Sequence, residues 1–333
     1  MSTTPSSTPP VTSTTLLHGS DAQPDQPQRD ATPRPRDTAG EGALVLGGGG
    51  STGNAWLIGV IAGLFDAGLD VTTADLTIGT SAGSTAAAQI AGESPTALFA
   101  ATVSAVSQQQ INRGGGGQRR SQVGPVSDSL EQLRKVIASA EDVADFRRKI
   151  GASALARAAA SDGSWQAQWR ATVAARLPGH QWPERPLLIT AVDAQTGEPL
   201  VFDRHSGVDL VDAVAASCAG GGIAYRIGDH SYIDGGYRRS SENADLAAGY
   251  KQVLVLSPLG GRTLHPLKWG SHLAAQIEEL RAGGSEVETI MPTSSSEHMF
   301  GANAMDGSLR PPAARAGFEQ GRALAEHLAT FWG

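Results

Sequence analysis

Cysteine and long apolar runs are both scarce in this chain. Among 333 residues there is one cysteine, Cys218, and the longest apolar stretch, residues 55–65, contains two glycines. A single cysteine excludes an intrachain disulfide and every metal site that needs several cysteines. The apolar stretch is far shorter than the roughly 20 residues that span a bilayer, and the first residues lack the apolar core of a secretory signal. We therefore expect a cytoplasmic protein with neither a signal peptide nor a transmembrane segment. Peripheral contact with a membrane stays open.

Positive charge is also in short supply. Lysine and arginine number 26 against 33 acidic residues, which gives a formal net charge of −7 at pH 7. An acidic balance of this kind argues against nucleic acid as a partner. Nothing in the sequence indicates the oligomeric state.

The first 40 residues lack the apolar content that a folded core needs. They are rich in serine, threonine and proline, which is typical of a low-complexity, disordered arm. The rest of the chain is long enough to bury a large core. The sequence therefore predicts a disordered N-terminal arm over residues 1–40 and a folded domain over residues 41–333.

Short apolar strands alternate with helical segments through the folded part. Strands are predicted at residues 43–46, 76–79, 187–192, 200–202, 253–256 and 287–290. Such alternation favours an α/β fold, a three-layer α/β/α sandwich around a mostly parallel central sheet. Residues 95–186 are mainly helical in pattern, so we interpret them as a helical insertion that covers the site.

The stretch Gly79-Thr80-Ser81-Ala82-Gly83 has the pattern G-x-S-x-G, with an apolar strand before it and a helical run after it. Strand, sharp turn and helix are the context of a nucleophile elbow, in which small residues flank an exposed serine at a helix N-terminus. Taken alone, the pentapeptide fits a glycine-rich turn without chemistry almost as well. Its position after a second glycine-rich loop strengthens the first interpretation.

That second loop, residues 47–53, follows the first predicted strand. Gly48 to Gly53 matches the dinucleotide-binding pattern, but no acidic residue ends the second strand, where a ribose would need one. The loop also has the glycine spacing of a P-loop, but Asn54 and Ala55 replace the lysine and the hydroxyl residue that hold phosphate and magnesium. An oxyanion hole is the third interpretation, because consecutive glycines expose backbone N–H groups. We favour it because neighbouring parallel strands would bring this loop beside the elbow.

A serine needs a base to become a good nucleophile. The chain has eight histidines, and none has a distinctive sequence context. Asp234-Gly235-Gly236 follows a short apolar strand, so the Asp234 carboxylate could approach a neighbouring loop. An ordinary Asp-Gly turn explains the same residues equally well.

Taken together and in this order, the three motifs resemble those of the patatin-like phospholipases. The resemblance covers about residues 42–332. It implies an α/β sandwich that hydrolyses acyl esters of lipids through a Ser-Asp dyad, without a metal or other cofactor. By that likeness Ser81 is the nucleophile, Asp234 is the base, and the oxyanion hole comprises the backbones of Gly48, Gly49 and Gly50 with Ala82 as a further donor. The other motif residues are Gly53, Gly79, Gly83, Gly235 and Gly236. Two further segments also match the family pattern: Ala215-Ala216-Ser217-Cys218-Ala219 and Asn243-Ala244-Asp245-Leu246.

Two positions depart from the family pattern. The family loop usually carries arginine or lysine where Thr52 stands, and a proline is common where Gly221 stands. These departures are the only support for a rival interpretation, a patatin-like fold that serves as a binding or regulatory module. A dinucleotide-binding protein is a more distant alternative. Arg113, Arg119 and Arg120 could meet a lipid surface or form an ordinary solvated loop, and the head group and acyl chain of a lipid or small ester substrate stay open.

Overall fold

The computed structural model describes Met1 and residues 41–112, 126–220 and 222–332. Three predictions from the sequence fall on residues outside these ranges. They concern the predicted arm beyond Met1 (residues 2–40), the basic loop with Arg113, Arg119 and Arg120, and Gly221.

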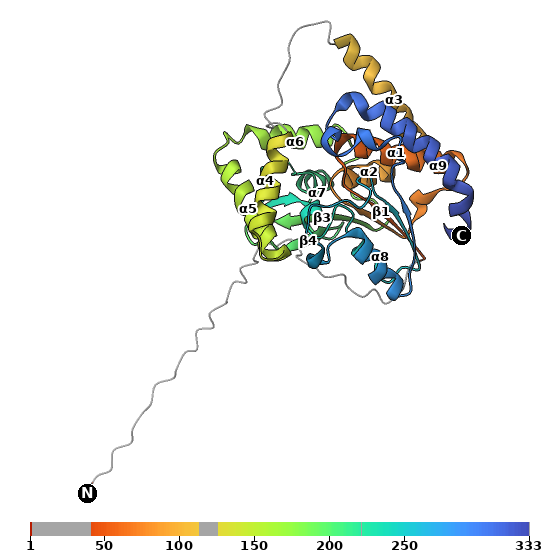
Figure 1. Ribbon diagram of the computed structural model, residues 1–333. Helices are drawn as coiled ribbons and strands as arrows, with labels where there is room; N and C mark the ends of the chain where they lie inside the picture. Colours follow the sequence, from red (N-terminus) through yellow and green to blue (C-terminus); the bar gives the residue numbers. More distant parts are fainter. Residues whose placement is uncertain (2–40, 113–125, 221, 333) are drawn as a thin grey trace.

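A central sheet of eight strands organises the described chain (Figure 1). The strand order is β5-β6-β3-β2-β1-β7-β8, and β4 pairs with β3 at the side. Strands β1, β2, β3, β7 and β8 run parallel, whereas β4 and β6 run antiparallel to β3, and β5 runs antiparallel to β6. The bounds are β1 Gly42–Leu46, β2 Leu76–Gly79, β3 Leu187–Asp193, β4 Pro199–Phe202, β5 Tyr225–Ile227, β6 His230–Asp234, β7 Gln252–Leu256 and β8 Glu286–Ile290.

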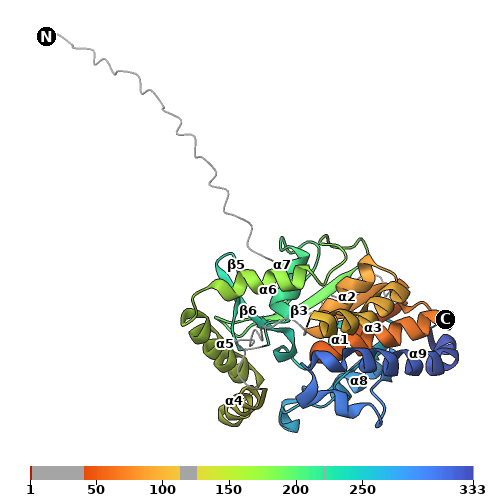
Figure 2. The same ribbon diagram turned by 90° about the horizontal axis from the view of Figure 1, so that it is seen from above.

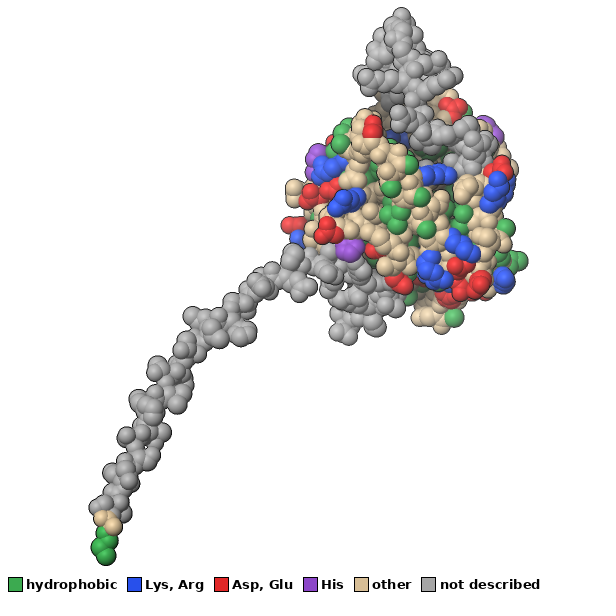
Figure 3. All heavy atoms as spheres, turned by 90° about the vertical axis from the view of Figure 1, so that its left-hand side faces the viewer, with side chains coloured by type: hydrophobic (Ala, Val, Ile, Leu, Met, Phe, Trp, Pro, Cys, Tyr) green, Lys and Arg blue, Asp and Glu red, His purple; other side chains and the backbone are tan. Residues whose placement is uncertain are grey.

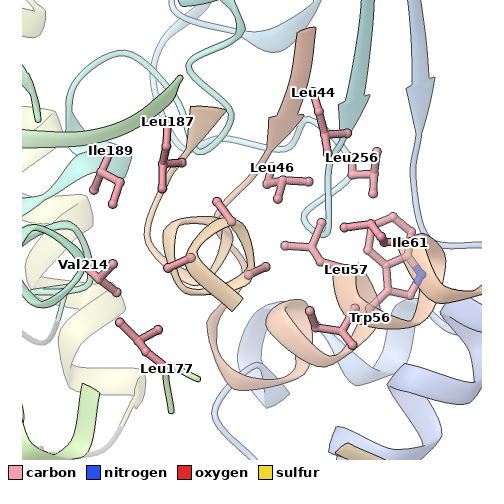
Figure 4. Close-up of a cluster of buried hydrophobic side chains, with 14 of the residues drawn as sticks. Leu44, Leu46, Trp56, Leu57, Ile61, Leu177, Leu187, Ile189, Val214 and Leu256 are labelled. Atoms are coloured by element: carbon pink, nitrogen blue, oxygen red, sulfur yellow. The ribbon is translucent and has the colours of Figure 1, made fainter. Parts of the chain in front are cut away.

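Alternation along β1 divides the core between the two faces of the sheet. Leu44 and Leu46 pack with Trp56 and Leu57 on one face, as Figure 4 shows, whereas Ala43 and Val45 pack into a second cluster on the other. Successive side chains of a strand point to opposite faces, so a strand buried on both sides must be apolar throughout. The predicted three-layer α/β/α fold is confirmed.

Helices cover both faces of the sheet. The first face carries α1 Gly50–Asp66, α2 Ala82–Gly92, α3 Pro95–Asn112, α6 Ser164–Ala174, α7 Leu210–Ser217 and α9 Arg310–Trp332. The second face carries α4 Val126–Ser139, α5 Val143–Ala159 and α8 Leu273–Ala282.

The helices between residues 95 and 186 divide between the two layers. Helix α3 packs against α1 and α9, and α6 packs against α7. Helices α4 and α5 lie on the other side of the molecule from α3 and α9 in both ribbon views (Figure 2). There Phe146 and Ile150 of α5 pack against Val192 of β3 and Ile233 of β6. Among the described residues of this segment, those that line the candidate site belong to α4 and α5.

Glycines let α1 and α9 approach until their backbones touch. A Cβ atom on Gly59 or Gly63 of α1 would overlap the Ala314 or Phe318 carbonyl of α9, and Gly317 and Gly321 face α1 in the same way. This close packing fixes α1, and the loop that precedes it, against the rest of the first layer.

Candidate active site

The glycine loop and the elbow leave neighbouring strands side by side. Strands β1 and β2 pair in parallel with Leu46 opposite Gly79, and the Thr80 N–H donates to the Leu46 carbonyl at 3.1 Å. A Cβ atom added to Gly48 would lie 3.4 Å from the Cβ atom of Ser81. The juxtaposition predicted from two consecutive parallel strands is confirmed.

The elbow holds Ser81 in a conformation that most residues avoid. Its φ of 53° and ψ of −116° put a serine in the positive-φ region, which costs about 1–3 kcal/mol. The turn is tight because β2 and α2 meet with almost no space between them. A Cβ atom on Gly79 would lie 2.6 Å from the Cα atom of Ser84, and one on Gly83 would overlap the Leu46 carbonyl oxygen. Only glycine fits at these two positions.

Asp234 lies at the end of β6 and reaches the Ser81 hydroxyl. Strand β6 pairs with β3 so that Asp234 stands opposite Ala191, one strand away from the elbow. The Ser81 hydroxyl donates to Asp234 Oδ2 at 2.7 Å, and the Gly236 N–H donates to Oδ1 at 2.8 Å. The two oxygens of the carboxylate are thus oriented separately, one toward the serine and one toward its own loop.

Burial raises the pKa of Asp234 to about 6 from an ordinary value of 3.8. The hydrogen bonds from Gly236 and Ser81 oppose this shift and favour the carboxylate, but less strongly than burial disfavours it. Gly220 adds to the burial, because a Cβ atom there would lie 2.8 Å from Oδ2. A carboxylate with a pKa near 6 accepts a proton more readily than an ordinary aspartate does.

Two residues at the end of α7 hold the backbone of Ser81. The Ser81 N–H donates to Ser217 Oγ at 2.9 Å, and the Cys218 thiol donates to the Ser81 carbonyl at 3.0 Å. The Ser84 hydroxyl donates to the same carbonyl at 2.6 Å. Burial raises the pKa of Cys218 to about 11, so the thiol keeps its proton and stays a donor. The strained serine is therefore fixed on both sides of its Cα atom.

Asn243 links the elbow to the turn that follows Asp234. Its side-chain amide donates to Thr80 Oγ1 at 3.0 Å and to the Gly235 carbonyl at 2.9 Å. The residue is fully buried and has a φ of 53°, a conformation that asparagine tolerates better than most residues do. Arg238 donates to Asn243 Oδ1 at 3.2 Å and forms a two-pronged ion pair with Asp245 at 3.0 and 2.9 Å. The guanidinium of Arg238 is therefore held by structural contacts.

The amides of the glycine loop differ in what they contact. The Gly48 N–H donates to the Ser241 carbonyl at 2.7 Å. Within the described residues the N–H groups of Gly49, Gly50 and Ala82 have no acceptor, as expected for groups at the N-termini of α1 and α2. Gly49 lines the same cavity as Ser81, whereas Gly50 lies against Ala304 and Met305.

The model of the patatin-like phospholipase family matches residues 44–248, more than half of the chain and all three motifs. The chain belongs to this family. Membership supports lipid acyl hydrolase activity at the level of the family. The structure is similar to that of VipD from Legionella pneumophila, with 14% sequence identity, a TM-score of 0.40, and coverage of 87% of this chain and 67% of VipD. Among proteins with curated descriptions, none matches the chain.

The candidate site opens into a cavity of about 420 Å³ with one apolar wall. Ser81, Asp234 and Gly49 lie along one part of it. Apolar side chains from α4, α5 and the segment after β7 form the wall: Leu133, Ile137, Phe146, Leu259 and Leu264. A wall of this kind suits a hydrocarbon chain better than a polar substrate.

His265 is the histidine that reaches this cavity, but its hydrogen bond lies elsewhere. Its Nδ1 lies 2.9 Å from Ser271 Oγ, and its ring packs against Phe146 and Trp269. Burial lowers the pKa of His265 to about 4, which keeps the ring neutral near pH 7. In the described ranges, histidine, cysteine and acidic side chains form no group of three that could hold a metal ion. None of the described helices combines the length and the hydrophobicity that a membrane-spanning segment needs.

Proposed function

We propose that this protein is a serine acyl hydrolase that cleaves carboxylic esters of lipids. The observation that carries the proposal is the 2.7 Å hydrogen bond between the Ser81 hydroxyl and an Asp234 carboxylate whose pKa is raised to about 6. A serine at a strained elbow beside a poised base is the arrangement that nucleophilic catalysis requires. Ser81 is the nucleophile and Asp234 is the general base.

The first half of the reaction acylates the serine. Asp234 takes the proton from Ser81 Oγ as this oxygen attacks the ester carbonyl and forms a tetrahedral intermediate. The C–O bond to the leaving alcohol then breaks, and Asp234 returns the proton to that alcohol. The products of this half are the free alcohol and an acyl ester on Ser81.

The second half regenerates the enzyme. Asp234 takes a proton from water, and the resulting hydroxide attacks the acyl ester. The Ser81 oxygen leaves and recovers the proton from Asp234, and the carboxylic acid departs. The same carboxylate therefore serves as base and acid in both halves.

Backbone N–H groups stabilise the oxyanion of each tetrahedral intermediate. Gly49 and Ala82 are the donors that we propose, because both flank Ser81 and both N–H groups lack an acceptor among the described residues. Removing one such donor typically slows catalysis by about 10²–10³-fold. Gly48 contributes differently: it packs beside the Ser81 side chain, and its N–H ties the loop to Ser241.

The test compares hydrolysis of a water-soluble ester and of dispersed lipid esters by wild type, Ser81→Ala and Asp234→Asn. We expect no turnover above background for Ser81→Ala and a kcat roughly 10²–10⁴-fold lower for Asp234→Asn. Asp75→Asn is the matched control, because Asp75 precedes β2 and caps Glu41 and Gly42 at the far end of that strand. Full activity of folded Asp234→Asn would refute the role of Asp234. No turnover by folded wild type would favour a binding module.

A further inference from the structure

The cavity wall continues to the molecular surface through one short segment. We call residues 259–270, between β7 and α8, the rim segment. Leu259 and Leu264 of this segment line the cavity that contains Ser81, and Leu264 is also 42% exposed to solvent. Apolar side chains of the rim segment therefore both line the cavity that contains Ser81 and reach the outside of the molecule.

Packing contacts anchor the rim segment, so its exposed side chains stay directed toward solvent. The Trp269 ring packs against Phe146 of α5 and against His265, with ring centroids 5.9 and 5.2 Å apart. This contact ends a short 3-10 turn, Leu267–Trp269, which Gly270 closes with a φ of 62°. The turn leaves Leu267 82% exposed, the largest exposed fraction of any large hydrophobic side chain between residues 41 and 332 that the structure describes.

Charge on the rim segment has one sign. The segment carries Arg262 and Lys268, and the sequence has no acidic residue between Asp245 and Glu278. Arg262 lies 3.9 Å from Glu297, and both side chains are more than half exposed, so this pair is weak. No described carboxylate pairs with Lys268. The face seen in Figure 3 carries basic and acidic side chains interspersed around small hydrophobic patches.

We propose that the rim segment docks the protein on the surface of a phospholipid bilayer that contains anionic lipids. Leu267 enters the boundary between head groups and acyl chains, and Lys268 and Arg262 contact anionic head groups. An acyl chain that leaves the bilayer then passes along Leu264 and Leu259 to Ser81 without crossing water. The proposal rests on the proposed function for the direction of that transfer, but the docking itself is independent of catalysis.

Binding to lipid vesicles tests the docking directly. Sedimentation would compare vesicles of phosphatidylcholine alone with vesicles in which a third of the lipid is phosphatidylglycerol. All proteins in this assay carry Ser81→Ala, so that the vesicles are not consumed. We expect binding to the anionic vesicles, a roughly tenfold or greater loss of partitioning for Leu267→Glu, and a roughly tenfold loss for Lys268→Glu on anionic vesicles only.

Phe65→Glu is the matched control. Phe65 is also a large exposed hydrophobic residue, 40% exposed, and it lies near the end of α1 that is remote from the glycine loop. This variant should bind like its parent. Equal partitioning of Leu267→Glu, Lys268→Glu and Phe65→Glu would overturn the proposal, as would absence of vesicle binding by the parent protein. If a protein partner occupied the rim segment instead, vesicle binding would not respond to Leu267→Glu.

A soluble ester separates this proposal from the proposed function. Neither Leu267 nor Lys268 lines the cavity, so with Ser81 intact their variants should hydrolyse a short water-soluble ester at the wild-type rate while losing activity on anionic vesicles. Binding without any hydrolysis would support docking and refute the function. Hydrolysis of vesicle lipid that is unchanged in both variants would support the function and refute docking.

Discussion

The Ser81 N–H donates to the Ser217 hydroxyl oxygen at 2.9 Å, although 136 residues separate the two in the chain. Because the φ of Ser81 is positive, its backbone tends to relax toward a commoner conformation, and this hydrogen bond opposes that relaxation. Ser217 is fully buried and belongs to α7, which packs against α2. We therefore infer that Ser217 is a positioning residue for the proposed nucleophile, Ser81.

Removing the Ser217 hydroxyl should slow the chemical step. For Ser217→Ala we expect kcat to fall about 10- to 100-fold with KM nearly unchanged, because a displaced nucleophile loses alignment rather than substrate affinity. Steady-state kinetics on a soluble ester measures both constants. Ser285→Ala is the control, since Ser285 is also buried and bonded to a backbone carbonyl but lies beside Tyr250, away from the site. An equal loss of kcat in both variants would argue against a positioning role.

The activity should follow the ionisation of Asp234. A base works only when it is deprotonated, and burial raises the pKa of Asp234 to about 6. We predict that kcat/KM rises with pH to a plateau with a midpoint near 6, and that it falls about tenfold for each pH unit below the midpoint. His265, with its pKa lowered to about 4, should not contribute to this profile above pH 5. A midpoint near 4 would show that the carboxylate is not perturbed as described.

The same pKa shift predicts that the ionised Asp234 lowers the free energy of unfolding above pH 6. Its folded pKa of about 6 exceeds the ordinary value of 3.8, so the folded protein binds more protons than the unfolded chain between these two values. Stability from this group is fully present below pH 4 and is lost as the pH rises through 6. Asp234→Asn should therefore be more stable than wild type at pH 8, by up to about 3 kcal/mol, with no difference near pH 3.5. Denaturant unfolding at both pH values measures the two differences, and a destabilised variant at pH 8 would contradict the prediction.

Asn243 should matter for both stability and activity. Asn243→Ala removes the amide that joins Thr80 to the Gly235 carbonyl and places an alanine at positive φ, so we expect a loss of about 2–4 kcal/mol in the free energy of unfolding and a lower kcat. Asn243→Gly tolerates the backbone conformation but still lacks the amide. It should recover part of the stability without recovering kcat. Full recovery of kcat in the glycine variant would show that backbone conformation alone is what Asn243 supplies.

The sequence could predict the relative placement of the glycine loop and the elbow. Both motifs follow apolar strands, and the pairing of β1 with β2 that puts Leu46 opposite Gly79 follows from ordinary α/β topology. The start of α1 was harder to predict. The helix begins at Gly50, inside the glycine-rich loop, and glycine is a weak helix former that does not signal a helix even when tertiary contacts impose one.

Contacts between segments that are distant in the chain could not be predicted from a single sequence. Two stretches that match the family pattern contain Ser217, Cys218 and Asn243. Nothing in those stretches indicates that these side chains contact the elbow. The engagement of the Gly48 N–H with Ser241 likewise depends on how the loop after β6 folds back over the glycine loop. These interactions are set by tertiary packing, and local propensity carries no information about them.

Covalent labelling with a fluorescent fluorophosphonate tests whether Ser81 is an activated serine. We predict that wild type is labelled on Ser81, as located by mass spectrometry, and that the labelling rate rises with pH with a midpoint near 6. Labelling should vanish in Ser81→Ala and slow strongly in Asp234→Asn. Folded wild type that takes up no label, or Ser81→Ala that is still labelled, would contradict this prediction.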